Sequence, residues 1–383
     1  MSVLEERMRA ALGGYTERGE IPGLVALVHH RGETHAVAAG TLTAGGDVPV
    51  ERDSLFRMAS LTKAVTAAAA MILVEECVLR LDDPVDELIP ELSDRRVLRR
   101  LDGPLDDTVP ARRPITVRDL LTFGMGIGQL FVPGGEDFPI LRAMSDPGVD
   151  RGPDGPDNGP DEWLKRLGRL PLMFQPGAAW TYNTGSDVLG IMIARAVGRS
   201  LHDFTTERIF EPLGMRDTGY YLPAGKLHRL VGSYLPGPVP RPDLREWDKP
   251  PVFAAGGGGP GLLSTADDYA AFCRMLLGKG GSILSRASVE LMTTDHLTPE
   301  QKAGNEPFLG SGGWGFGVHV ANRMDHLYTR PGRFGWAGGL GTTAYTDPAE
   351  GLVGVLLTQV AMTSPVPPKV FQDFWTTVYT SID

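Results

Sequence analysis

FRMASLTKAVTAAAAMILVEE, residues 56–76, is the stretch around which we expect the fold to be organised. The whole stretch predicts one long helix, and residues 65–74 are almost wholly apolar, which places that helix in the core. Its first turn carries Ser60 and Lys63, and side chains three positions apart share a helix face. Ser60 could be a helix N-cap and Lys63 a solvated side chain. Alternatively, a hydroxyl at the positive end of a helix, beside an amine, could be an activated nucleophile.

The bulk composition is that of an ordinary globular protein. The chain has 383 residues, enough for two to three domains at most, with 42% hydrophobic and 22% charged residues. Its formal net charge of -10 argues against nucleic acid or an anionic membrane as a partner. The N-terminus lacks the continuous apolar segment of a signal peptide, and no apolar run reaches about 18 residues. We therefore expect a cytoplasmic protein, with Cys77 and Cys273 as buried free thiols.

Strand patterns lie near both ends of the chain and helical patterns in the middle. The predicted strands are a hairpin at residues 24–42 and three strands at 314–320, 339–348 and 351–362. Amphipathic helices are predicted at residues 3–18 and near the C-terminus. This order indicates an α+β fold in which the two termini build one antiparallel sheet flanked by helices. The predicted domains are a discontinuous sheet domain (1–75 and 252–383) and a mostly helical domain with irregular loops (76–251).

Two further patterns suggest a metal or a cofactor only weakly. His29, His30 and His35 fall on the predicted hairpin, in a spacing that matches no usual zinc site. Residues 256–261 satisfy G-x-G-x-x-G, but no clear strand precedes them and no βαβ unit surrounds them. We therefore expect no metal and no cofactor.

Two more stretches become candidate motifs once a catalytic Ser–Lys pair is suspected: residues 175–185 (QPGAAWTYNTG) and 335–341 (GWAGGLG). Taken together and in this order, the three motifs resemble those of the penicillin-recognising serine enzymes, namely class C β-lactamases, their D-aminopeptidase relatives and the family VIII carboxylesterases. The matching positions are Ser60 and Lys63, then Tyr182, then Trp336-Ala337-Gly338. Connecting segments at residues 120–126, 209–220 and 254–269 are similar as well, so the resemblance runs from about residue 15 to 360.

The departures from the family pattern bear on substrate. Trp336 stands where β-lactamases usually carry a lysine, so the cation that would hold a β-lactam carboxylate is missing. Thr184 replaces an asparagine that contacts the substrate amide, and Phe123 replaces a frequent histidine. The W-x-G form of the third motif is typical of the esterase-like members. No G-x-S-x-G occurs, which excludes an α/β-hydrolase elbow as the source of the nucleophile.

The resemblance implies that Ser60 forms an acyl-enzyme. Either Lys63, if burial keeps it neutral, or Tyr182, if Lys63 stabilises its phenolate, would be the base. Backbone N–H groups of Ser60 and Gly339 would hold the oxyanion. The substrate-binding residues would be Thr184, Trp336, Ala337 and Gly338.

The first function expected is a serine hydrolase of the carboxylesterase type, acting on small esters or amides. The alternative is an acyltransferase of the same fold in a biosynthetic pathway. A β-lactamase, a D-aminopeptidase or an inactive scaffold ranks below both. The expected partner is a small-molecule ester, amide or acyl donor, and the sequence leaves the oligomeric state open. We expect residues 124–161 and 222–255 to line the pocket.

Overall fold

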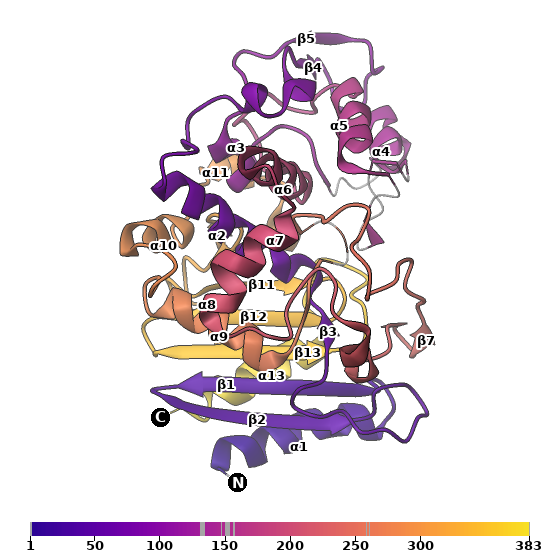
Figure 1. The fold of residues 1–383 in the computed structure, drawn as a ribbon, viewed down its shortest axis with the longest axis vertical. Helices are drawn as coiled ribbons and strands as arrows, with labels where there is room; N and C mark the ends of the chain where they lie inside the picture. Colours follow the sequence, from indigo (N-terminus) through magenta and orange to yellow (C-terminus); the bar gives the residue numbers. More distant parts are fainter. Residues whose placement is uncertain are drawn as a thin grey trace.

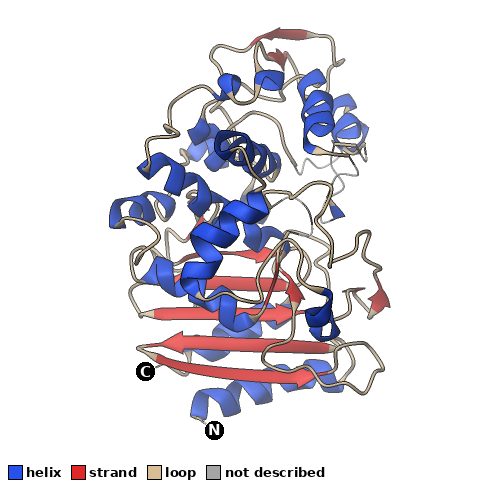
Figure 2. Ribbon diagram, in the orientation of Figure 1, coloured by secondary structure: helices blue, strands red, loops and turns tan. Residues whose placement is uncertain are grey.

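A seven-stranded antiparallel sheet forms the base of the molecule (Figures 1 and 2). The computed structural model describes residues 2–130, 135–146, 148–149, 154–155, 158–257, 259 and 261–382. Across the sheet the strands are β2 (Glu33–Gly40), β1 (Gly23–His30), β13 (Leu352–Thr358), β12 (Thr342–Asp347), β11 (Phe334–Gly338), β10 (His319–Val320) and β9 (Gly313–Trp314). The first and last strands of the chain pair directly, Leu24 opposite Thr358. The α+β sheet built from both termini is therefore confirmed.

The sheet is covered on both faces, which explains why its central strands are almost continuously apolar. One face packs on α1 (Val3–Glu17) and α13 (Lys369–Tyr379) through a separate apolar cluster that includes Leu24 and Leu356. The other face packs on α2 (Thr62–Glu75) and α9 (Ala266–Leu277), with Val25 and Leu357 in the main core. Strand β13 is buried at every position.

The helix predicted over residues 56–76 begins later than expected. Residues Phe56–Arg57 form a short strand, β3, paired with β8 (Leu263–Ser264). A 3-10 helix (Ala59–Leu61) follows, and only then does α2 start at Thr62. Ala59 has a φ of +45°, a left-handed conformation that a helix interior does not allow, so the chain turns sharply just before Ser60. The expectation of one helix over the whole stretch was wrong.

Most of the remaining helices, α3 to α7 among them, lie above the sheet in Figure 1. The remaining α-helices are α3 (Val117–Leu121), α4 (Pro139–Met144), α5 (Pro160–Arg169), α6 (Thr184–Val197), α7 (Leu201–Thr205), α8 (Glu211–Leu213), α10 (Arg286–Met292), α11 (Pro299–Lys302) and α12 (Glu306–Leu309). Two-stranded ladders join β4 (Arg96–Leu98) to β5 (Thr108–Pro110) and β6 (Tyr234–Leu235) to β7 (Val239–Pro240). None of the helices in the described residues combines the length and the apolar character needed to cross a membrane.

Cys273 is buried, as expected, but Cys77 is exposed. Cys77 has a φ of +60° and lies just after the end of α2, where the chain turns out to the surface. The two thiols are free.

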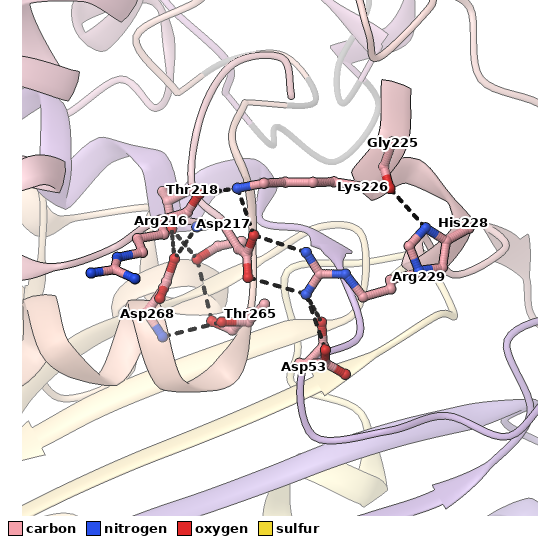
Figure 3. A network of polar contacts seen from close by, with 11 residues as sticks. Asp53, Arg216, Asp217, Thr218, Gly225, Lys226, His228, Arg229, Thr265 and Asp268 are labelled. Atoms are coloured by element: carbon pink, nitrogen blue, oxygen red, sulfur yellow. Dashed lines mark hydrogen bonds and ion pairs between the residues drawn. The ribbon is translucent and has the colours of Figure 1, made fainter. Parts of the chain in front are cut away.

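The irregular segment between residues 216 and 251 is held against the sheet domain by a polar network (Figure 3). Arg229 donates to both oxygens of Asp217, at 2.8 and 3.1 Å, and reaches Asp53 beside β3. Asp268 in the first turn of α9 accepts from the Asp217 amide and from the Thr218 hydroxyl. Because this segment also pairs with residues 55 and 360, it belongs in space with the sheet. The domain boundary predicted at residue 251 stays a prediction.

Candidate active site

Ser60 and Lys63 lie at the end of α2 that points toward β11. Lys63 Nζ is 2.9 Å from Ser60 Oγ, and the lysine side chain is fully buried while Ser60 is partly exposed. The N-cap position of α2 is Leu61, and no side chain caps the helix there. The N-cap interpretation of Ser60 and the solvated interpretation of Lys63 are therefore both wrong.

The glycine-rich segment at 256–261 packs directly on this helix end. Gly257 has a φ of +142°, and a Cβ there would lie 2.4 Å from Lys63 Cγ. This close approach brings the Gly257 carbonyl to Lys63 Nζ, which donates a hydrogen bond to it. Gly256 lies between α6 and α2, since its carbonyl accepts from Ser186 of α6 and from Thr66 of α2. Gly258 lies outside the described residues. Gly257 and Gly256 therefore allow the chain to pack closely on Lys63 and on Ser186, respectively.

Tyr182 approaches the same point from the segment before α6. Backbone hydrogen bonds in both directions with Gln129 fix its position, and Asn183, with a φ of +82° and ψ of -66°, makes the tight turn into the helix. Its hydroxyl accepts a hydrogen bond from Trp336 Nε1 at 2.7 Å. Its ring faces the lysine, with Nζ 4.7 Å from the ring centroid.

Burial raises the pKa of Tyr182 above its ordinary value, and hydrogen bonding with Ser60 and Trp336 only partly opposes that effect. Burial therefore favours the neutral phenol over the phenolate. Because an indole nitrogen only donates, the phenol oxygen is the acceptor in the bond with Trp336. The proton of the phenol is then directed elsewhere, and Ser60 is its other hydrogen-bond neighbour.

Aromatic rings enclose Tyr182 and hold it in place. Phe308 is tilted by 30° against it at 4.7 Å between ring centroids, and Phe123 meets it edge-on at 5.7 Å. Trp314 stacks on Phe123 at 4.9 Å and meets Trp336 edge-on at 4.8 Å. Phe123, which stands where the family often has a histidine, is thus a packing residue behind Tyr182.

Strand β11 brings the third motif against the turn that carries Ser60. A Cβ on Gly338 would lie 2.4 Å from the Met58 carbonyl oxygen, so only glycine allows this approach. The next residue, Gly339, faces open space. Ser60 and Gly339 both line the same cavity, so their backbone amides lie where an oxyanion could be held.

These groups meet at a cavity of about 200 Å³. Its lining includes five residues that the sequence analysis assigned to one site: Ser60, Tyr182, Trp336, Ala337 and Gly339. Gly338 and Thr184 are not among the lining residues of the described chain. Gly338 packs behind the wall, and Thr184 is buried in the first turn of α6. The geometry therefore gives no support to substrate contact by either residue.

Several lining residues were not found from the sequence. They are Gln129, Asn183, Phe308, Tyr345, Met362, Ser364, Pro365 and Pro367. Residues 124–161 and 222–255 were expected to line the pocket. Of the described residues, only Gln129 from the first segment does so, and none from the second. Part of the first segment lies outside the described residues. The proximity of Asn183 to Tyr182 in sequence was a usable signal. Phe308 and residues 362–367 had none, because they reach the cavity only through the tertiary fold.

Comparison with known proteins gives a consistent family assignment. Residues 7–368 match the family model described as "Beta-lactamase". An uncharacterized protein of Mycobacterium tuberculosis is 40% identical over 380 residues, covering 92% of this chain and 89% of that protein. The lovastatin esterase of Penicillium rubens is 30% identical (84% and 83% covered), and esterase EstB of Burkholderia gladioli is also 30% identical (94% and 91% covered).

Solved structures agree on the β-lactamase/transpeptidase fold. EstCE1, described as a hydrolase with promiscuous acyltransferase activity, superposes with a TM-score of 0.82 at 24% identity, covering 98% of both chains. A mutant simvastatin synthase of Aspergillus terreus gives 0.79 at 25% identity, covering 98% and 96%. A class C β-lactamase gives 0.72 at 16% identity, covering 99% and 96%.

Proposed function

This chain belongs to the β-lactamase family, and from that premise we propose that it is a serine hydrolase of the carboxylesterase type, forming an acyl-enzyme on Ser60. The observation that carries the proposal is the 2.9 Å contact between Ser60 Oγ and the fully buried Lys63 Nζ. A serine hydroxyl needs a base within hydrogen-bond reach, and this amine meets that distance.

In the proposed reaction Ser60 Oγ bonds to the carbonyl carbon while its proton passes to Lys63. The Gly257 carbonyl, which accepts from Nζ, orients the amine for this transfer. The amides of Ser60 and Gly339 stabilise the oxyanion. The leaving alkoxide takes a proton from Tyr182, which regains one from Lys63. Water then adds to the acyl-enzyme carbonyl and gives a proton to Lys63, which returns it to Ser60 Oγ as the acid leaves.

Lys63 is favoured over Tyr182 as the base. The raised pKa of Tyr182 disfavours its phenolate, so the tyrosine is better suited to donate its proton than to accept one. Trp336 supports that role because its N–H occupies the phenol oxygen and leaves the phenol proton free to point at Ser60 or the leaving oxygen.

The cavity walls favour an ester over a β-lactam. Trp336, Phe308 and Pro367 are apolar at the positions that face the substrate, and Trp336 occupies the motif position of the usual cation. The two esterase relatives, each 30% identical, support the same choice. A small ester with an apolar acyl or alcohol part is the proposed substrate class.

The test is covalent labelling with a fluorophosphonate, followed by peptide mapping and by turnover of p-nitrophenyl butyrate. The label is expected on Ser60, and Ser60→Ala should lose both label and turnover. Ser364→Ala, which removes another serine hydroxyl lining the cavity, should keep the label on Ser60. Label on another residue, or full turnover by Ser60→Ala, would refute the assignment. Turnover of nitrocefin faster than that of the butyrate ester would overturn the substrate class.

Acyl transfer is the second candidate, because the chemistry is the same up to the acyl-enzyme and only the acceptor differs. The likeness to a simvastatin synthase at 25% identity supports it. Adding alcohols or amines to the butyrate assay and measuring the transfer product against free butyrate separates the two. A product ratio that favours transfer at low acceptor concentration would identify an acyltransferase.

A further inference from the structure

A second cavity, of about 320 Å³, opens beside the first. Four residues line both cavities: Phe308, Ala337, Tyr345 and Pro367. The second cavity then follows β11, from Ala337 beside the Ser60 site to Arg333 just before the strand begins. Four residues of extended chain span about 13 Å, so Arg333 lies about that far along the strand from Ala337.

Arg333 is a buried cation with an unused hydrogen-bonding edge. Its side chain is 3% exposed, and its Nε and Nη2 atoms have no hydrogen-bond partner. Nε and Nη2 form the edge of a guanidinium that pairs with both oxygens of a carboxylate. The chain uses the same edge elsewhere: Arg52 holds Asp267 with two bonds of 2.7 Å, and Arg118 holds Asp82 at 2.7 and 2.9 Å.

Several neighbours hold Arg333 in place: Tyr379 hydrogen-bonds with it and the carboxylate of Asp347 attracts it, while the buried Nε and Nη2 atoms keep no partner. The rings of Tyr345 and Trp375 lie 3.9 and 4.2 Å from its guanidinium carbon, which fixes the faces of the group. The nearby carboxylate of Asp347 accepts from the Tyr379 hydroxyl and from two backbone amides. Arg330, three residues earlier, pairs with Glu350 at the surface.

A second unsatisfied group lies along the same cavity. His319, opposite Gly335 in the ladder with β11, contacts the Leu309 carbonyl through Nε2, and its Nδ1 has no partner. A carbonyl only accepts, so Nε2 carries the proton and Nδ1 of the neutral ring is an acceptor. Glu306, Asp325 and Arg323 also line the cavity, but all three are exposed at its rim, where solvent screens their charges.

We propose that the substrate extends from Ser60 along β11 into this second cavity and carries a carboxylate at its far end, bound by Arg333. The inference rests on the proposed function of Ser60 for the scissile bond. The carboxylate-bearing end is joined to that bond by a chain of at most about 13 Å, the Cα separation of Ala337 and Arg333, because the Arg333 guanidinium lies 3.9 Å from the ring of Tyr345, which lines both cavities. Arg333 is thus a specificity-determining residue, because it selects acidic esters over neutral esters of equal length.

Two ester series test the proposal, each bracketing that length. One carries the carboxylate on the acyl chain, as p-nitrophenyl monoesters of dicarboxylic acids, and the other on the alcohol, as butyrate esters of ω-hydroxy acids. Methyl-terminated esters of equal length are the reference. In one series kcat/KM should favour the acid by about tenfold or more, mainly through KM, near the bracketed length. That series identifies which part of the substrate enters the cavity. A preference for neutral esters at every length in both series would overturn the proposal.

The matched variants are Arg333→Met and Arg330→Met. Arg333→Met should abolish the preference, Arg333→Lys should keep part of it, and Arg330→Met should keep it in full. An unchanged preference in Arg333→Met would overturn the proposal. Calorimetry of a long saturated dicarboxylate on Ser60→Ala, with and without Arg333→Met, tests the site without turnover. Binding lost only with Arg333→Met supports the site even if the hydrolase proposal fails. Equal or absent binding overturns it even if Ser60 is the nucleophile.

Discussion

Trp336→Phe tests the arrangement around Tyr182 most directly. The substitution removes the 2.7 Å bond from the indole N–H to the phenol oxygen while keeping an aromatic ring in the cluster. Leaving a buried hydroxyl without this partner costs about 1–3 kcal/mol. If the bond positions the phenol in the transition state, kcat falls by about 5- to 150-fold. Because Trp336 also lines the cavity, a change in KM reports the smaller ring at the wall, whereas the fall in kcat reports the lost bond to the phenol.

Trp314→Phe is the matched control, because Trp314 lies 4.8 Å from Trp336 in the same cluster and its own indole N–H has no partner. It removes the same atoms from the core but no hydrogen bond. The measurement is kcat and KM for p-nitrophenyl butyrate in both variants, with thermal unfolding to check folding. A Trp336→Phe enzyme within twofold of the native kcat, or an equal loss in Trp314→Phe, would refute the reasoning.

Three further perturbations have defined outcomes. Gly338→Ala should lower both kcat and the unfolding temperature, because the added Cβ would lie 2.4 Å from a backbone oxygen at the Ser60 turn. Gly339→Ala is the control and should keep the unfolding temperature, because its Cβ would meet nothing within 4 Å. Burial raises the pKa of Tyr345 to about 12, above the unfolded value of about 10. The folded protein is therefore stabilised by the protonated tyrosine below pH 10 and should lose that stability between about pH 10 and 12. The measurement is the unfolding temperature against pH, together with tyrosinate absorbance. Asp119→Asn should lower the free energy of unfolding by about 2 kcal/mol, measured by chemical denaturation, because this buried carboxylate accepts hydrogen bonds from Arg113 and from the backbone amide of Thr116 at the helix cap. Asp102→Asn, which removes an exposed ion pair, should leave that free energy almost unchanged.

The order of the motifs was enough to predict the fold and to bring five cavity residues together. Strand patterns near both ends of the chain predicted the sheet. Its central strands could be recognised because a strand that is covered on both faces is apolar at nearly every position. The Ser60–Lys63 spacing predicted a shared helix face, although Ser60 turned out to lie in the 3-10 turn before α2. Local spacing sets which side chains can meet along one element, and that information is in the sequence.

The role of Thr184 shows where this reasoning stops. Asn183 and Thr184 are neighbours in the sequence, yet Asn183 lines the cavity and Thr184 does not. Asn183 has a φ of +82°, and the chain turns there into α6. That conformation is imposed by the backbone pairing of Tyr182 with Gln129, more than 50 residues away.

By itself, then, the sequence determined the α+β sheet, the family resemblance and the Ser60, Lys63 and Tyr182 group. Only the tertiary structure decided which groups face the cavity, that the phenol oxygen is held by Trp336, and that Arg333 is buried beside a second cavity. The physical reason is the distance along the sequence over which each effect acts. Periodicity and turn chemistry act over a few neighbouring residues, whereas burial and hydrogen-bond partners depend on segments such as Phe308 and residues 362–367 that meet the site only after the sheet has closed.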